Sequence, residues 1–129
     1  MQTFFKLFII TLFFTFLTNV GYSQKQPNWT APAKYKTMKI QKGEITTGKE
    51  LYSKNCKSCH GSKGLGDGPK AASLKTFPGN FTDKKLQSKT DGELYFISII
   101  GYDEMPNFEK KILDEQDRAS IVSYIRTLK

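Results

Sequence analysis

The sequence is poor in the side chains that usually build metal sites and disulfide frameworks. Its 129 residues include two cysteines and one histidine, namely Cys56, Cys59 and His60. A structural zinc site needs four ligands, usually cysteine or histidine, so these three residues are too few. A disulfide between Cys56 and Cys59 would close a very small loop and would not link distant parts of the chain. The cysteines must therefore have another use.

The alternation of apolar and polar residues that is typical of β-strands is also missing. Helical patterns instead cover three segments, residues 47–56, 90–100 and 114–128, and the second of them stops at Gly101. A glycine-rich stretch over residues 61–69 cannot form a regular helix. We therefore expect an all-α domain with three main helices and long loops.

Each predicted helix has a recognisable start signal. Thr47 with Glu50, and again Thr90 with Glu93, have the spacing of a capping box. Asp114 is a candidate N-cap for the last helix. The apolar face of that helix consists of Ile121, Val122, Ile125 and Leu128, with Tyr124 at its edge.

The first residues read as a secretory signal rather than as part of the domain. Residues 7–17 form an apolar run that is shorter than the about 20 residues a membrane span needs. Small residues at Gly21 and Ser23 match the −3 and −1 positions of a cleavage site. We predict a signal peptide over residues 1–23 that is cleaved after Ser23. The alternative is an uncleaved N-terminal membrane anchor.

Acidic residues are absent from residues 24–42, which contain five lysines. The formal net charge of the whole chain is +8, and residues 43–129 are nearly neutral, with 14 basic and 12 acidic side chains. We therefore expect residues 24–42 to form a basic, largely extended arm, which packs Trp29 or Tyr35 onto the domain. Residues 43–129 are expected to form the folded domain.

The expected domain has a stability problem. A small domain with long polar loops buries little apolar surface, and such domains usually need a staple. A large bound cofactor would supply both the staple and an apolar core.

Cys56, Cys59 and His60 form the motif that indicates this cofactor. Two thiols three residues apart on a helical turn lie on one face, from which both can form thioethers with one haem. His60 follows directly and would bring an imidazole to the iron, and this pattern is a c-type haem attachment signal. A thioredoxin-like dithiol would need a strand before the motif, whereas a helix is expected there. The sequence therefore predicts one covalent haem c with its iron.

The sixth iron position needs a ligand from the far side of the haem. There is no second histidine, so methionine is the natural candidate. Met1 leaves with the signal, and Met38 lies in the arm. Met105 follows the end of a helix and precedes Pro106, which favours extended backbone. We predict that Met105 is the ligand. The alternative is that Met105 only fills a gap in the core.

With these residues in view, the segment 47–129 resembles a class I monohaem c-type cytochrome. Residues 48–52 and 56–61 are similar to the haem-binding helix of that family, and residues 101–106 are similar to its distal-ligand loop. The resemblance implies three main helices and long loops wrapped around one haem. It also implies that the first and last helices cross closely, with Gly48 allowing the approach and Tyr124 packing beside it.

The resemblance also implies a partner for the proximal histidine. Gly68-Pro69 resembles a turn of the family whose proline carbonyl accepts a hydrogen bond from that histidine. Carried over, Pro69 would orient His60. Its spacing from the motif is short, and Pro78 is the alternative.

These features predict an electron carrier rather than an enzyme. When protein ligands fill both axial positions, the iron does not readily bind a substrate, and His/Met ligation raises the reduction potential. No nucleophile–base pair stands out, and Asp103 and Glu104 read as loop solvation rather than as proton donors. One alternative is a haem peroxidase or gas-binding protein in which Met105 is a labile ligand.

The expected setting is the cell envelope. We predict a periplasmic monomer that exchanges electrons with an oxidase, reductase or dehydrogenase, through an acidic docking surface on the partner. The basic arm could also touch a membrane surface. We expect no nucleic-acid partner. The alternative is a membrane-tethered subunit of an oxidase or reductase complex, facing the periplasm, which would require an uncleaved signal.

Overall fold

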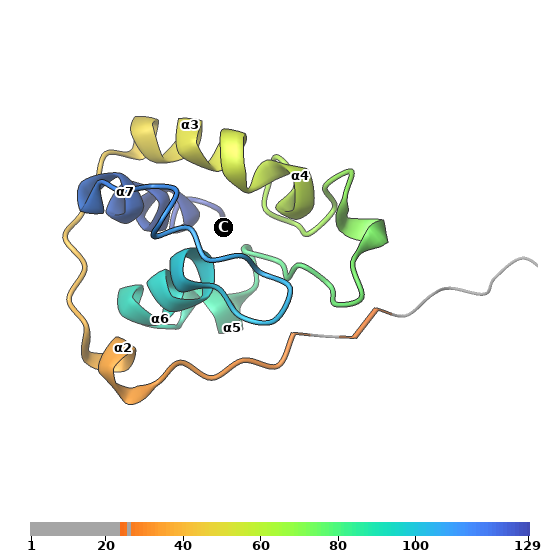
Figure 1. The fold of residues 1–129 in the computed structure, drawn as a ribbon, viewed down its shortest axis with the longest axis horizontal. Coiled ribbons are helices and arrows are strands. Elements are labelled where there is room, and N and C mark those ends of the chain that lie inside the picture. The colour runs from red at the N-terminus through yellow and green to blue at the C-terminus, as the bar shows by residue number, and fades with distance from the viewer. Residues whose placement is uncertain (1–23, 26) are drawn as a thin grey trace, which may run out of the picture.

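The computed structural model describes residues 24–25 and 27–129, and the predicted signal peptide over residues 1–23 lies outside them (Figure 1). The described residues contain helices and no strand, apart from one isolated bridge between Lys25 and Thr76. The prediction of an all-α fold is therefore confirmed. The elements in chain order are α2 (Ala33–Thr37), α3 (Ile45–Asn55), α4 (Lys57–His60), η1 (Ala71–Ser73), α5 (Lys84–Gln87), α6 (Asp91–Tyr95), the π-helical turn η2 (Phe96–Ile100) and α7 (Glu115–Ile125).

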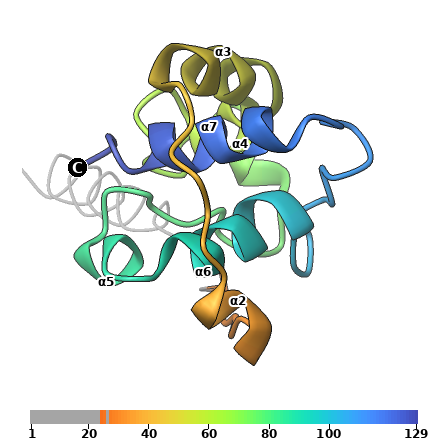
Figure 2. The same ribbon diagram turned by 90° about the vertical axis from the view of Figure 1, so that its left-hand side faces the viewer.

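The first long helix, α3, crosses the last helix, α7, at close range (Figures 1 and 2). Gly48 makes this possible, since a Cβ there would collide with the carbonyl oxygen of Ser120 and approach the Cβ of Tyr124 to 2.9 Å. The Tyr124 ring in turn packs against Tyr52 of α3, with 5.2 Å between the ring centroids. The close crossing and the places of Gly48 and Tyr124 are as predicted.

Helix α3 begins earlier than its predicted capping box, so that prediction was wrong. The N-cap is Glu44, and Thr47 lies inside the helix. The Glu44 side chain makes no capping hydrogen bond; instead the Glu44 backbone N–H donates to Ser120 Oγ at 2.9 Å. The Gly43 N–H donates to Ser123 Oγ at 2.9 Å. Helix α7 thus supplies two hydrogen-bond acceptors where α3 begins, and a local sequence pattern does not contain this tertiary information.

The other two start signals are confirmed. The Thr90 hydroxyl accepts from the Glu93 N–H at 3.2 Å, and the Glu93 carboxylate accepts from the Thr90 N–H at 2.9 Å. The Asp114 carboxylate accepts from the Asp117 N–H at 3.0 Å. In both cases the signal is local, because the cap and its partner lie three residues apart.

The core lies between α3, α6 and α7. Helix α7 buries Ile121, Val122 and Ile125 almost completely, as its predicted apolar face requires. Leu94 and Ile99 of the α6–η2 segment have no exposed surface. The core also contains aromatic rings, including those of Tyr35, Tyr52, Phe81, Phe96, Phe108 and Tyr124.

The arm touches the domain at several of its described residues, and Figure 2 shows the chain passing from α2 up to α3. A largely extended arm was expected, and the structure places the short helix α2 within it. Tyr35 of α2 is buried and packs on Phe96, with 4.9 Å between the ring centroids. Trp29 is half-buried against the core. At the start of the arm, Gln24 Nε2 donates to the carbonyl oxygens of Ala71 and Leu74.

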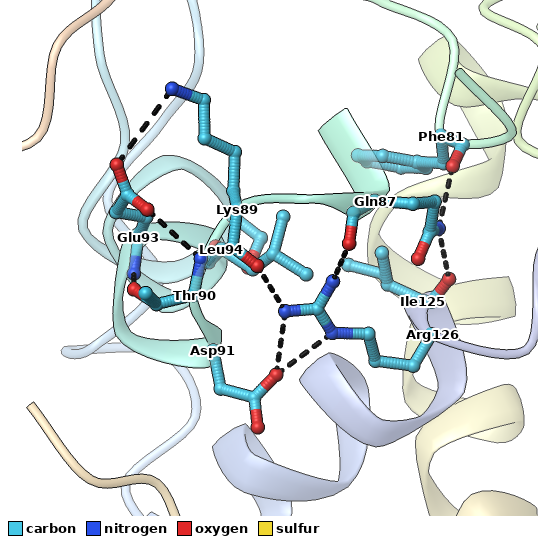
Figure 3. Close-up of polar contacts among 10 residues, drawn as sticks. Phe81, Gln87, Lys89, Thr90, Asp91, Glu93, Leu94, Ile125 and Arg126 are labelled. Atoms are coloured by element: carbon cyan, nitrogen blue, oxygen red, sulfur yellow. Dashed lines mark hydrogen bonds and ion pairs between the residues drawn. The ribbon is translucent and has the colours of Figure 1, made fainter. Parts of the chain in front are cut away.

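The C-terminal end of α7 is tied to the α5–α6 connection by polar contacts (Figure 3). Arg126 forms an ion pair with Asp91 at 2.7 Å and donates to the carbonyl oxygens of Gln87 and Lys89. The Gln87 amide donates to the carbonyl oxygen of Phe81 at 2.7 Å, and also to backbone carbonyls near the chain end. These contacts fix the position of Phe81, whose ring lies in the candidate site.

Among the residues that the structure describes, no helix combines the length and the apolar character that a bilayer span requires.

The helix crossing gives a stability prediction. Gly48→Val should lower the free energy of unfolding by about 3 kcal/mol or more, because the new side chain meets the α7 backbone, which cannot move aside. Urea denaturation measures the change. Ser53→Val is the control, since Ser53 is an exposed residue of the same helix, and its effect should stay within about 0.5 kcal/mol. Equal losses in the two variants would mean that the crossing is not close.

Candidate functional site

The predicted attachment motif forms one helical turn at the end of α3. The backbone breaks at Cys56, which caps α3 and precedes α4. The Cys56 carbonyl oxygen accepts from the N–H groups of Cys59 and His60, at 3.2 and 2.9 Å. Gly61 then reverses the chain with a φ of +78°, a conformation that favours glycine. The motif residues are therefore held on one turn.

The two thiols have different surroundings. Cys56 is buried in the hydrophobic core, whereas Cys59 is half-buried. Burial raises the pKa of the Cys56 thiol to about 12, and the neighbouring Cys59 adds a smaller effect. A thiol with this pKa is protonated at neutral pH, unlike a redox-active cysteine, which reacts as the thiolate. Cys56 is therefore not an activated thiol.

His60 is buried in an apolar setting, with 6% of its surface exposed. Its ring stacks on Phe81, with 4.5 Å between centroids and 19° between planes. Burial lowers the pKa of His60 to about 4, and a contact with the Gly79 backbone partly opposes the shift. The imidazole is therefore neutral at pH 7, which is the form that binds a metal ion.

His60 opens onto a cleft between the motif and the distal loop. The cleft is open to solvent at its mouth. Its walls come from six segments of the chain, represented by Pro27, Asn28 and Trp29, by Cys59 and His60, by Leu74, Thr76, Phe77, Pro78, Gly79 and Phe81, by Leu86, by Ile97, and by Tyr102, Asp103, Glu104, Met105 and Pro106.

Met105 lies in this cleft, on the loop that follows η2. Gly101 ends the helix with a φ of +84°, and a Cβ there would collide with the Met105 carbonyl oxygen. The Met105 N–H donates to the Tyr102 carbonyl oxygen at 3.0 Å, which closes a tight turn. Met105 is half-buried and packs against the core. Met38, by contrast, packs beside Gly92 and does not line the cleft.

The two prolines predicted as alternative partners of His60 lie on different sides of the motif. Pro69 is exposed and is absent from the walls of the cleft. It belongs to a turn behind α4, where the N–H groups of Gly68 and Lys70 donate to the carbonyl oxygens of Cys59 and Ser58. Pro78 lines the cleft, and the Gly79 backbone that follows it contacts the imidazole.

Sequence reasoning missed several residues of the cleft. Pro27, Asn28 and Trp29 belong to the arm, and no local pattern indicates that an extended segment returns to the motif. Phe81 carried no motif either, although it is one of two phenylalanines, with Phe77, in the loop around Pro78. Glu104 was read as a solvated loop residue, yet its carboxylate accepts hydrogen bonds from two backbone N–H groups.

The residues present fit a haem bonded at the motif. Nδ1 of His60 is buried and has no hydrogen-bond partner among the described residues. A buried polar atom without a partner lowers the stability of the fold unless a bound group changes its surroundings. The ring faces a cleft with mostly apolar walls, to which Cys59 contributes. A thioether sulfur, Met105, is also in the cleft, and imidazole with thioether is a known axial pair for haem iron.

Two comparisons with known proteins bear on this site. The sequence model of the family described as cytochrome c matches residues 45–129, from the first residue of α3 to the chain end. The chain is also similar to a protein of Corynebacterium diphtheriae described as cytochrome bc1 complex cytochrome c subunit. The identity is 29% over 90 residues, which cover 70% of this chain and 29% of the relative. The family match includes the motif and Met105 but not the arm.

Proposed function

This chain belongs to the cytochrome c family, whose members bind covalent haem c, and we propose that it carries single electrons with His60 and Met105 as the axial ligands. Family membership makes the chain a haem-based electron-transfer component. The proposal also names the residues that attach the haem: Cys56 and Cys59 would hold it through thioethers. The observation that supports it best is that Met105, which is far from the motif in the sequence, lines the same cleft as Cys59 and His60.

When bound, the haem supplies an iron that takes up and gives back one electron. The protein's part is to hold that iron and to keep other ligands away. His60 and Met105 would occupy both axial positions, so that no substrate needs to reach the metal. The apolar walls of the cleft reduce contact with water, which raises the reduction potential together with the methionine ligand.

The orientation of His60 is assigned to the segment that follows Phe77. Because Pro78 lines the cleft and the Gly79 backbone contacts the imidazole, we infer that this segment holds the ring, in place of Pro69. The stacked ring of Phe81 restricts rotation of the imidazole from one face. Pro69 would then act indirectly, by shaping the turn behind α4.

The proposed partners are redox proteins of the cell envelope, reached after export. The bc1-complex name of the relative supports exchange with a membrane-bound respiratory complex such as an oxidase, reductase or dehydrogenase. The five lysines of the arm would attract an acidic partner or an anionic membrane surface. Such attraction is measured as a fall in association rate when ionic strength rises.

A second candidate is a cytochrome subunit or domain of a larger complex. The observation that favours it is that the relative, of which this chain spans 29%, is described as a cytochrome c subunit of a bc1 complex. Residues 1–23 would then act as a tether instead of a cleaved signal. An intact-mass measurement of the protein from its host distinguishes the two, since cleavage after Ser23 removes a defined mass.

The binding of carbon monoxide tests the carrier against a peroxidase or gas-binding protein. The reduced protein at neutral pH should bind carbon monoxide only slowly and incompletely, because Met105 would compete with the gas for the iron. The measurement is the absorption spectrum before and after the gas is added. Rapid and complete binding would mean that the sixth position is open or labile, and would favour the catalytic or sensing alternative.

A further inference from the structure

The loop that carries Met105 is fastened across the mouth of the cleft by an acidic side chain. Glu104 Oε2 accepts from the Thr76 N–H at 2.7 Å, and Oε1 accepts from the Lys75 N–H at 3.3 Å. Asp103 Oδ2 accepts from the Thr76 hydroxyl at 3.3 Å. Both carboxylates therefore bind the same short segment, although 27 to 29 residues separate the partners in sequence.

The backbone at this point is bent in an unusual way. Asp103 has a φ of +57°, and it is the one residue other than glycine with a positive φ among the described residues. A left-handed conformation costs a non-glycine residue about 1–2 kcal/mol, so it persists only where surrounding contacts hold it. The turn between Tyr102 and Met105 places both carboxylates against the 75–76 segment, which accounts for the conformation.

Residues 75–76, to which the methionine loop is fastened, are themselves held in place. The Phe77 N–H donates to the Lys25 carbonyl oxygen at 2.9 Å, within the isolated bridge between Lys25 and Thr76. Gln24 binds the carbonyl oxygens of Ala71 and Leu74. The 75–76 segment thus lies between the arm and the methionine loop. The arm lies outside residues 45–129, which match the family.

We propose that Glu104 is a positioning residue, which keeps Met105 on the iron by fastening the methionine loop to the backbone of residues 75–76. The inference rests on the proposed ligand role of Met105. Without this fastening, the 102–106 loop keeps only the Asp103 contact with the 75–76 segment and leaves the iron more often, so an external ligand reaches the iron for a larger fraction of the time.

Glu104→Gln tests the proposal in the haem-loaded full-length protein. The amide keeps one oxygen acceptor, but its NH2 group faces the second backbone N–H, so one of the two hydrogen bonds is lost. The rate of carbon monoxide binding to the reduced protein should rise about three- to tenfold, as expected for loss of one hydrogen bond to a charged acceptor at an exposed site. The near-infrared methionine–iron charge-transfer band should weaken in parallel.

Two further variants make the outcomes distinct. Glu50→Gln makes the same charge change at an exposed position on α3, away from the cleft, and should leave the rate unchanged. Met105→Ala should bind carbon monoxide much faster than Glu104→Gln or Glu50→Gln. If Glu104→Gln behaves like the unmodified protein while Met105→Ala binds fast, the positioning role is overturned and the ligand assignment stands. If Met105→Ala also leaves the rate unchanged, the ligand assignment fails, and the positioning role fails with it.

Discussion

Replacement of both Cys56 and Cys59 by alanine will give a chain that loses its haem to acid–acetone extraction. The two thioethers are the covalent links that the motif provides, so without them the cofactor is held only by axial ligation and apolar contact. Loss of the haem leaves the apolar cleft without its occupant. We expect the free energy of unfolding to fall by about 3 kcal/mol or more, because the apolar walls lose the group against which they pack.

The controls for this experiment lie within the motif. Each single cysteine variant should keep one thioether and therefore retain haem through denaturing electrophoresis, with an altered spectrum. Ser58→Ala should change neither property, although the Ser58 hydroxyl lies 3.9 Å from the Cys59 sulfur. Extraction of free haem from the unmodified protein would refute covalent attachment at this motif.

Met105→Ala will remove the near-infrared methionine–iron band and open the iron to carbon monoxide. The reduction potential should fall by on the order of 0.1 V, within the roughly 0.8 V range over which axial ligands set haem potentials. The cause is the loss of a thioether ligand that favours the reduced iron. Spectroelectrochemistry of the variant measures both effects.

Met38→Ala is the matched control, because it deletes the other methionine that the structure describes. Met38 is half-buried, packs beside Gly92 and is absent from the cleft walls. Its removal should cost some stability but should leave the band and the potential unchanged. Loss of the band in the Met38 variant, with the band retained in Met105→Ala, would transfer the ligand role to the arm.

Features encoded by neighbouring residues could be predicted from the sequence. The turn from Cys56 to His60 depends on consecutive residues, and the Thr90 and Asp114 caps each depend on a partner three residues away. The close crossing at Gly48 came from the family resemblance, and the structure explains it through contact with Ser120.

Features that depend on distant parts of the chain could not be predicted in this way. Helix α3 begins at Ile45 because α7 provides acceptors for the N–H groups before it, so the local signal at Thr47 was misleading. Glu104 looked like a solvated carboxylate, since its partners at residues 75–76 are far away in the sequence. Trp29 was expected to touch the domain, but its place in the cleft wall follows only from the path of the arm.

A redox titration of the haem-loaded protein tests the central claim most directly. The spectrum is followed while the potential is stepped in both directions, with small mediators present. The account predicts one reversible transition that fits a single electron, with the methionine–iron band recovered in full on reoxidation. A transition that is irreversible, that needs more than one electron, or that leaves the band absent after reoxidation would contradict a carrier with His60 and Met105 on the iron.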